Sequence, residues 1–284
     1  MSNARDALDA IGHLPDVEID IAGAALQLAR IDEPDRDWQA AGRHLSDLAR
    51  EAFDLARDLR TENALVRARG LATLITGRHR YCGDTDTYDD PANANLIQVI
   101  ERRRGLPVAL GVIWLHCTRT VGWGAHGLDF PGHFLLGLES HPATRGRSAT
   151  SQQLVIDVFA GGVPLEAKDL RALLKHVAGP SVELQPGVLQ PMSARRVLLR
   201  LQENVRVRRL RHEDILGALA CTEDMLRIAP DNAALWREAA LMNQRAGRIG
   251  AALRCFNRFL QLVPEGDTAE RARAAMDELR SRLN

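Results

Sequence analysis

The last third of the chain repeats itself at a fixed interval of 34 residues. The matched positions are Ala218 with Ala252, Cys221 with Cys255, Leu226 with Leu260, and Pro230 with Pro264. A period of this length is that of a helix–turn–helix unit, which stacks on its copies to bury an apolar face. The interval therefore predicts two helical units, over 196–230 and 231–264, followed by a terminal helix over 268–283.

The same period is that of the tetratricopeptide repeat, and the residue types agree with it. Trp236, Ala252, Phe256 and Pro264 fall where that repeat places its Trp, Ala, Phe and Pro. The alanine lets two helices approach closely, and the proline ends the second helix. Since fewer than three repeats are marginal alone, we expect the tail over 196–284 to pack against the preceding domain.

Composition bounds the class of protein and its partners. Hydrophobic residues make up 45% of the 284 positions and charged residues 26%, which is typical of a globular protein with a core. Acidic and basic residues number 37 each, so no global field favours nucleic acid or membrane. No apolar run approaches the ~20 residues of a membrane span. The N-terminus lacks the basic and apolar segments of a signal peptide, so we expect a cytoplasmic protein.

Most of the chain from Val17 to Val121 is predicted to be helical. The expected helices are Val17–Ala29, Asp37–Leu59, Thr61–Gly77, 94–103 and Pro107–Val121. The last of these is apolar nearly all round and should be central to the core. His133–Leu138 and Leu154–Phe159 are predicted to form an antiparallel strand pair, and 161–195 a linker zone. Together these elements predict an α+β core.

Neither the acidic residues nor the cysteines predict a metal site or another cofactor. The loop over 82–94 carries four aspartates, but it lacks the central Gly and bidentate Glu of a calcium loop, so we expect a solvated acidic loop. The four cysteines are far apart and form no C-x-x-C pair, which argues against zinc and against a disulfide framework. Cys117, Cys221 and Cys255 lie in apolar helical contexts and are expected to be buried.

Chemistry-bearing residues are concentrated between Pro91 and Phe159. The segments are Pro91-Ala92-Asn93-Ala94-Asn95-Leu96, Arg103-Arg104-Gly105-Leu106-Pro107, Pro131-Gly132-His133-Phe134 and Ile156-Asp157-Val158-Phe159. A papain-type site needs a thiolate at a helix N-terminus, a histidine as general base and an acidic or amide side chain that orients the histidine. His133 and Asp157 supply the last two. No Cys, Ser or Thr begins the helix at Pro107.

In the order of these motifs the chain resembles the SirB-type proteins, a branch of the transglutaminase-like superfamily with a tetratricopeptide tail. The resemblance implies a transglutaminase-like, papain-like core over 1–185, with a helical part over 1–80 and a motif-bearing part over 91–162. The repeat tail would occupy 196–284. In transglutaminases the nucleophilic cysteine stands near the start of the core helix. Counting back from Gly122, which ends that helix here, places the corresponding position at Pro107 or, with loose alignment, at Ala109.

The missing nucleophile favours a non-catalytic protein that binds or regulates a partner. His133 and Asp157 form a degenerate triad, and Arg103, Asn93, His133 and Asp157 are the residues expected to bind a ligand in the cleft. The alternative is an amide or peptide hydrolase or acyltransferase with Cys82 or a bound water as nucleophile. Cys117 lies about 15 Å along the helix from its start, too far to serve if His133 faces that start.

A protein or peptide partner is expected to bind the repeat tail. Seven arginines crowd its first helix: Arg195, Arg196, Arg200, Arg206, Arg208, Arg209 and Arg211. A solvated helix face is the simpler interpretation, and a basic groove for an acidic partner segment is the alternative. Nucleic acid is not expected, because no aromatic residues are interleaved with the charges.

Overall fold

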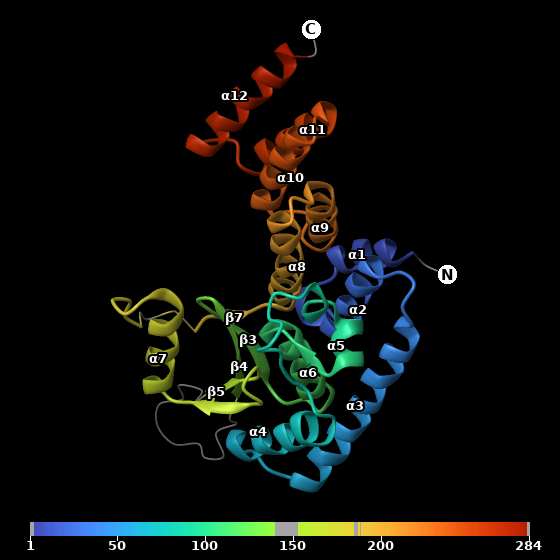
Figure 1. Ribbon diagram of the computed structural model, residues 1–284, viewed down its shortest axis with the longest axis vertical. Helices are drawn as coiled ribbons and strands as arrows, with labels where there is room; N and C mark the ends of the chain where they lie inside the picture. Colours follow the sequence, from blue (N-terminus) through green and yellow to red (C-terminus); the bar gives the residue numbers. More distant parts are fainter. Residues whose placement is uncertain (1–2, 140–152, 185–186, 188, 283–284) are drawn as a thin grey trace. The chain divides into compact units, whose positions relative to one another are not determined.

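The computed structural model describes residues 3–139, 153–184, 187 and 189–282 and divides into two compact units (Figure 1). One unit is Pro15–Leu201, and the other combines Met1–Leu14 with Gln202–Asn284. The sequence placed 1–185 in the core and 196–284 in the tail. The first helix, α1 (Ala4–His13), instead belongs to the unit of the C-terminal helices, and α8 (Ala194–Arg211) crosses the boundary.

The larger unit begins with a run of helices, most of which the sequence anticipated, although the short helices Asp16–Glu18 and Pro91–Asn93 were not predicted as separate elements. They are η1 (Asp16–Glu18), α2 (Ile21–Asp32), α3 (Trp38–Leu59), α4 (Ala64–Ala72), η2 (Thr73–Arg78), η3 (Pro91–Asn93), α5 (Leu96–Arg102) and α6 (Pro107–Thr120). Asp37 is the N-cap of α3, because its side chain accepts a hydrogen bond from the Ala40 N–H at 2.9 Å. The predicted central helix is confirmed, since α6 is buried from Pro107 to Leu115.

An antiparallel sheet of five strands follows, in the order β6-β5-β4-β3-β7. The strands are β3 (Ala125–Phe130), β4 (His133–Glu139), β5 (Gln153–Asp157), β6 (Val163–Leu165) and β7 (Pro191–Met192). The predicted pairing of β4 with β5 is confirmed, with Leu136 opposite Ile156. A separate parallel pair joins β1 (Cys82–Gly83) to β2 (Arg104–Gly105) just before α6.

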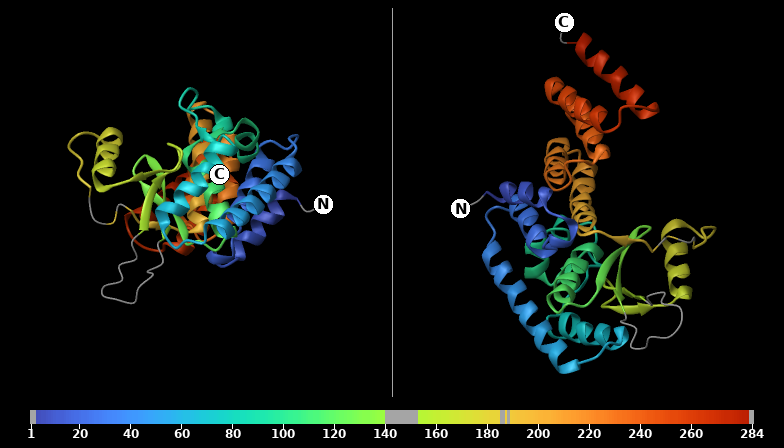
Figure 2. Two further views of the ribbon diagram at one scale, coloured as in Figure 1. Left: turned by 90° about the horizontal axis from the view of Figure 1, so that it is seen from below. Right: turned by 180° about the vertical axis from the view of Figure 1, so that it is seen from behind.

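Helices cover both faces of this sheet (Figures 1 and 2). Gly111 of α6 lies so close to the Phe134 ring that an added Cβ would stand 2.1 Å from it. On the opposite face, Leu170 and Leu174 of α7 (Ala167–Ala178) pack with Leu128, Phe130, Leu135 and Val155. The linker predicted over 161–195 was therefore wrong, since this segment supplies β6, α7 and β7 to the folded unit.

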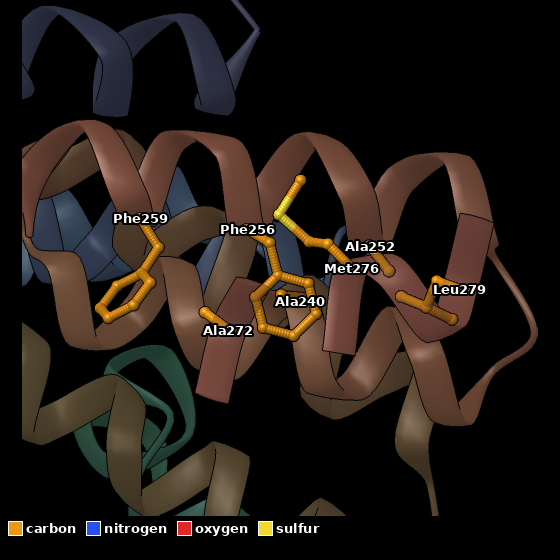
Figure 3. Packing of buried hydrophobic residues seen from close by; sticks show 7 residues of the cluster. All are labelled: Ala240, Ala252, Phe256, Phe259, Ala272, Met276 and Leu279. Atoms are coloured by element: carbon orange, nitrogen blue, oxygen red, sulfur yellow. The ribbon is translucent and has the colours of Figure 1, made fainter. Parts of the chain in front are cut away.

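The smaller unit contains the predicted helical repeats. Its helices are the end of α8, then α9 (Ile215–Ile228), α10 (Ala233–Arg245), α11 (Ile249–Leu262) and α12 (Asp267–Ser281). The packing of the second repeat is shown in Figure 3, where Phe256 lies among Ala240, Ala252, Phe259, Ala272, Met276 and Leu279. Ala252 is fully buried, as the close approach of two helices requires. The repeat interval thus predicted these helices correctly.

The arginine-rich helix is only in part the solvated face that the sequence suggested, since the Arg196 side chain is 61% exposed. Arg206 and Arg208 are buried. Arg206 is paired with Glu203 and Glu238, and Arg208 donates to the carbonyl oxygen of Asn204 at 3.1 Å. Arg206 therefore joins α8 to α10, whereas the Arg208 bond lies within α8.

Candidate functional site

His133 and Asp157 meet at the ends of two neighbouring strands. His133 begins β4 and Asp157 ends β5, and the imidazole Nε2 lies 3.0 Å from Oδ1 of Asp157. Their side chains are only 12% and 13% exposed. The same carboxylate oxygen accepts hydrogen bonds from the N–H groups of Phe159 at 2.9 Å and Ala160 at 3.2 Å. The turn after β5 thus fixes the carboxylate, and the carboxylate fixes the imidazole.

Aromatic rings connect this pair to the strands that precede α6. The Phe159 ring stands edge-on to the His133 ring at 6.1 Å and to the Tyr88 ring at 5.9 Å. It also covers Gly83, where an added Cβ would stand 2.5 Å from the ring. Gly83 pairs with Gly105, two residues ahead of α6. One aromatic ring therefore contacts both the imidazole and the strand pair that leads into the central helix.

The start of α6 is apolar and buried. Leu106 is its N-cap residue and offers no side-chain cap, and Pro107 occupies the first helical position. Val108 and Ala109 are buried. The backbone N–H of Leu106 donates to the carbonyl of Asn93 at 2.9 Å, which fastens the helix start to the preceding loop. The first turn of α6 is thus made of packed aliphatic side chains.

Asn93 holds the loop ahead of α5 together. Its side chain is fully buried, donates to the carbonyl of Thr87 at 2.6 Å and accepts from Arg102 at 3.2 Å. Asp84 lies in the same network, accepting from the N–H of Thr87 at 2.9 Å and from Arg102 at 3.0 Å. Asp84 is buried, so the prediction of a fully solvated acidic loop was wrong at this residue.

Arg103 belongs to a second polar cluster rather than to the histidine–aspartate pair. Its backbone is left-handed, with φ 60°, and its guanidinium donates to the Tyr81 hydroxyl at 2.5 Å and contacts His44 Nε2. Burial lowers the pKa of His44 to about 4, with Arg103 adding to the effect, and burial raises the pKa of Tyr81 to about 12. Among the described side chains, its hydrogen bonds do not reach His133 or Asp157.

Neither cysteine of the larger unit is hydrogen-bonded to His133 in the described structure. Cys82 is exposed, and its thiol lies 3.8 Å from the backbone oxygen of Arg103. Cys117 is buried, and burial raises the pKa of its thiol to about 12. Within the described parts of the chain, no thiol is hydrogen-bonded to the His133 imidazole. As predicted, Cys117 and Cys221 are buried, whereas Cys255 is half-buried.

Sequence reasoning missed the residue that positions His133 from outside the strand pair. Arg200 of α8 donates to the backbone oxygens of His133 at 2.7 Å and Phe130 at 3.4 Å, and it also pairs with Asp129. Arg196 joins it, binding Asp129 at 3.1 Å. Nothing in the spacing signalled this contact, because nearly every cation in the chain is an arginine.

Neither a metal-binding cluster nor a membrane-spanning helix occurs among the described residues. Over residues 3–139, 153–184, 187 and 189–282, no three His, Cys, Asp or Glu side chains come together in a way that could hold a metal ion. The helices in those ranges include none that is long and apolar enough to cross a membrane.

The whole arrangement can be compared with known proteins. A model of the transglutaminase-like superfamily matches residues 39–203, which is more than half of the chain. The chain belongs to the transglutaminase-like superfamily. A tetratricopeptide-repeat model matches residues 205–277 of this transglutaminase-like protein.

Bacterial relatives match nearly the whole length of this superfamily member. A UPF0162 protein of Xylella fastidiosa strain Temecula1 is 30% identical over 272 residues, covering 93% of this chain and 91% of the relative. A UPF0162 protein of Vibrio cholerae is 26% identical over 261 residues, covering 92% and 93%. No solved structure matches the chain significantly. These matches therefore extend over both the core and the tail of this chain.

The chemistry open to this transglutaminase-like core is limited by its parts. A histidine held by a carboxylate can accept a proton from a nucleophile or hydrogen-bond a ligand. Acyl transfer also needs an attacking atom within hydrogen-bond reach of the imidazole. The described structure supplies the oriented imidazole. The first turn of α6 consists of the buried residues Pro107, Val108 and Ala109.

Proposed function

We propose that this protein is a non-catalytic binding or regulatory protein of the cytoplasm. Its transglutaminase-like core lacks the nucleophile, and its tetratricopeptide tail recognises a protein or peptide partner. The motif order from Asn93 to Asp157 also leads us to place the chain in the SirB-type branch. The surface around His133 and Asp157 would serve as a second recognition surface.

The observation that carries this proposal is the buried, aliphatic first turn of α6. A catalytic thiolate must meet both its base and the substrate, so its position has to be accessible. Pro107, Val108 and Ala109 are all buried. A substrate carbonyl would have to displace packed side chains merely to reach the place where a nucleophile belongs.

The tail offers apolar side chains to a partner. Leu216 on α9 and Leu241 on α10 are both exposed. Apolar residues left exposed on a repeat whose core is already filled are suited to burial against another protein. A tail of this kind supports partner binding by protein contacts and favours neither nucleic acid nor membrane.

The rival function, an amide hydrolase or acyltransferase, rests on Cys82 or on a bound water. Cys82 is the exposed cysteine among those of the described chain, and its neighbour Gly83 touches Phe159. A nucleophilic Cys82 would depend on His133 to accept its proton. A merely exposed Cys82 would react at the same rate with or without that imidazole.

The deciding experiment compares Cys82 in two versions of the full chain. We expect iodoacetamide to label Cys82 at the same rate in the wild type and in His133→Ala, with Cys82→Ser as the unlabelled control. We also expect no amine or ammonia to be released from glutamine-containing peptides. Labelling that falls with His133→Ala, or amide turnover that is lost in that variant, would instead establish the enzyme.

The binding half of the proposal has its own test. Cross-linking in cells is followed by recovery of the full chain in three versions: wild type, Leu241→Glu, and Phe53→Glu as a control. Phe53 is an exposed apolar residue of α3 in the other unit. We expect a defined partner that is recovered with the wild type and with Phe53→Glu but lost with Leu241→Glu. Equal recovery of the partner with all three versions would mean that Leu241 and the tail surface around it do not bind the partner.

A further inference from the structure

The first helix of the chain is built to lie against the repeat tail. Asn3 caps α1, accepting from the Arg5 N–H, and Asp6 completes a capping box. Ala4 and Leu8 are buried, and α1 belongs to the same unit as the C-terminal helices. Figure 1 shows α1 beside α9. A helix of ten residues is marginal on its own in water, so docking keeps it helical.

Two crossed ion pairs fix how α1 lies on α9. The Arg5 guanidinium holds Asp224 at two points, Nε to Oδ1 at 2.9 Å and Nη2 to Oδ2 at 3.4 Å. Only 3% of the Asp224 side chain is exposed. Asp9 of α1 accepts from Arg227 of α9 at 2.6 Å. Because each helix supplies one cation and one anion, a shift of register would bring like charges together.

A glycine allows the close approach of the two backbones. An added Cβ at Gly12 would stand 2.2 Å from the Arg227 carbonyl oxygen, so a larger residue would force the helices apart. Arg5, Leu8, Asp9 and Gly12 occupy positions i, i+3, i+4 and i+7, which form one face of a helix. The docking face of α9 therefore contacts an arginine, an aspartate and a glycine at helical spacing, and the buried Leu8 lies on the same face of α1.

We propose that the face of α9 around Asp224 and Arg227 is a docking site for one amphipathic helix with arginine, leucine, aspartate and glycine at this spacing. In the free protein α1 is its intramolecular occupant, and a partner helix of the same chemistry binds by displacing α1. This inference rests on the proposed role of the tail in binding a partner, and it names the chemistry of that partner.

The linkage between α1 and the rest of the chain suits such an exchange. Leu14 and Pro15, which follow α1, have extended backbones and partly exposed side chains. A tethered helix competes at an effective concentration in the millimolar range, so the site is filled until a stronger helix arrives. Release of α1 is then a local unfolding event that leaves the repeat core in place.

The test uses a synthetic peptide of residues 1–14 with a fluorophore at its C-terminus. Its binding to the wild-type full chain and to a full-chain Leu8→Glu variant is followed by fluorescence anisotropy. In the variant α1 should leave the α9 face, because the burial of a carboxylate at position 8 is unfavourable. We expect binding to the variant and an affinity at least about tenfold weaker for the wild type, because α1 already occupies the site. Circular dichroism confirms that the variant is folded, and full-chain Arg5→Glu serves if it is not.

Charge reversal identifies the site on α9. A peptide carrying Arg5→Glu should lose at least about tenfold in affinity, and Asp224→Arg in the Leu8→Glu chain should restore its binding. The proposal is overturned if the unaltered peptide fails to bind the folded variant, if it binds the wild type equally well, or if charge reversal has no effect. If the peptide experiments fail while recovery of the partner remains sensitive to Leu241→Glu, the α9 docking site is wrong and the proposed function is unaffected.

Discussion

The guanidinium of Arg200 donates a 2.7 Å hydrogen bond to the backbone oxygen of His133. It also donates to the carbonyl of Phe130, so a single side chain is hydrogen-bonded to the last residue of β3 and to the first residue of β4. Gly132 in that turn has φ +63°, a conformation that favours glycine. The histidine of the candidate site is therefore held by Asp157 through its ring and by Arg200 through its backbone.

Replacing Arg200 should destabilise the protein and loosen His133. Arg200→Met removes one donor from each of two carbonyls, and we expect the free energy of unfolding to fall by about 1–3 kcal/mol. Urea unfolding of the full chain measures the loss, and the ¹⁵N spectrum of the His133 ring reports its orientation. The matched control is Arg196→Met, since that side chain is 61% exposed compared with 22% for Arg200. Its cost should stay below about 1 kcal/mol. Equal costs would mean that Arg200 does not position the turn.

Local signals in the sequence were sufficient for most helices and for the central strand pair. Asp37 caps α3 by accepting from the Ala40 N–H, and this depends only on residues close in the chain. The meeting of His133 and Asp157 could be anticipated because each lies at the end of a neighbouring strand of one sheet. Such features need only short-range chemistry or a single strand pairing.

Contacts between distant segments could not be predicted in this way. Arg200 lies 67 residues from His133, and Arg5 lies 219 residues from Asp224. In a chain with so many arginines, no spacing singles out the one that is buried. The aliphatic start of α6 was visible in the sequence, but its burial depends on how the loop with Asn93 folds over it. Tertiary packing decided each of these points.

Acid should weaken the fold through Asp84. The Thr87 backbone N–H contributes most to lowering the pKa of Asp84 from its ordinary 3.8 to about 2, burial opposes this, and the Thr87 hydroxyl and Arg102 assist. A lowered folded-state pKa stabilises the protein fully above about pH 4, and the effect is lost as the pH falls towards 2. We expect unfolding free energy to drop by on the order of 2 kcal/mol across that interval.

Amide substitution separates Asp84 from the other carboxylates. In Asp84→Asn the drop between pH 4 and pH 2 should shrink, because the residue no longer titrates. The matched control is Asp86→Asn, which removes an exposed carboxylate paired with Arg104 and should leave the pH dependence nearly unchanged. Guanidinium unfolding at a series of pH values measures both. An unaltered slope in Asp84→Asn would contradict the assignment.

Substitution of two glycines, Gly122 and Gly162, should distinguish the cost of backbone strain from the cost of a steric clash. Gly122 and Gly162 both have positive φ, +68° and +84°. An added Cβ at Gly122 meets nothing within 4 Å, whereas at Gly162 it would stand 2.3 Å from the Trp114 ring. We expect Gly122→Ala to cost about 1 kcal/mol from strain alone and Gly162→Ala roughly 2–4 kcal/mol, because overpacking is added. Thermal unfolding compares them, and similar costs would contradict the close packing at Gly162.

The repeat tail should lose its second unit when the Phe256 ring is removed. Phe256 is buried among Ala240, Ala252 and Met276, so Phe256→Ala leaves a cavity that should cost about 3–5 kcal/mol. Stability in repeats is a sum of local terms, so amide hydrogen exchange should rise first in α10, α11 and α12. Leu241→Ala is the matched control, since that side chain is exposed on α10 and its loss should change stability by less than about 0.5 kcal/mol. If exchange in α11 stayed at the wild-type level in Phe256→Ala, the ring would not be the centre of this packing.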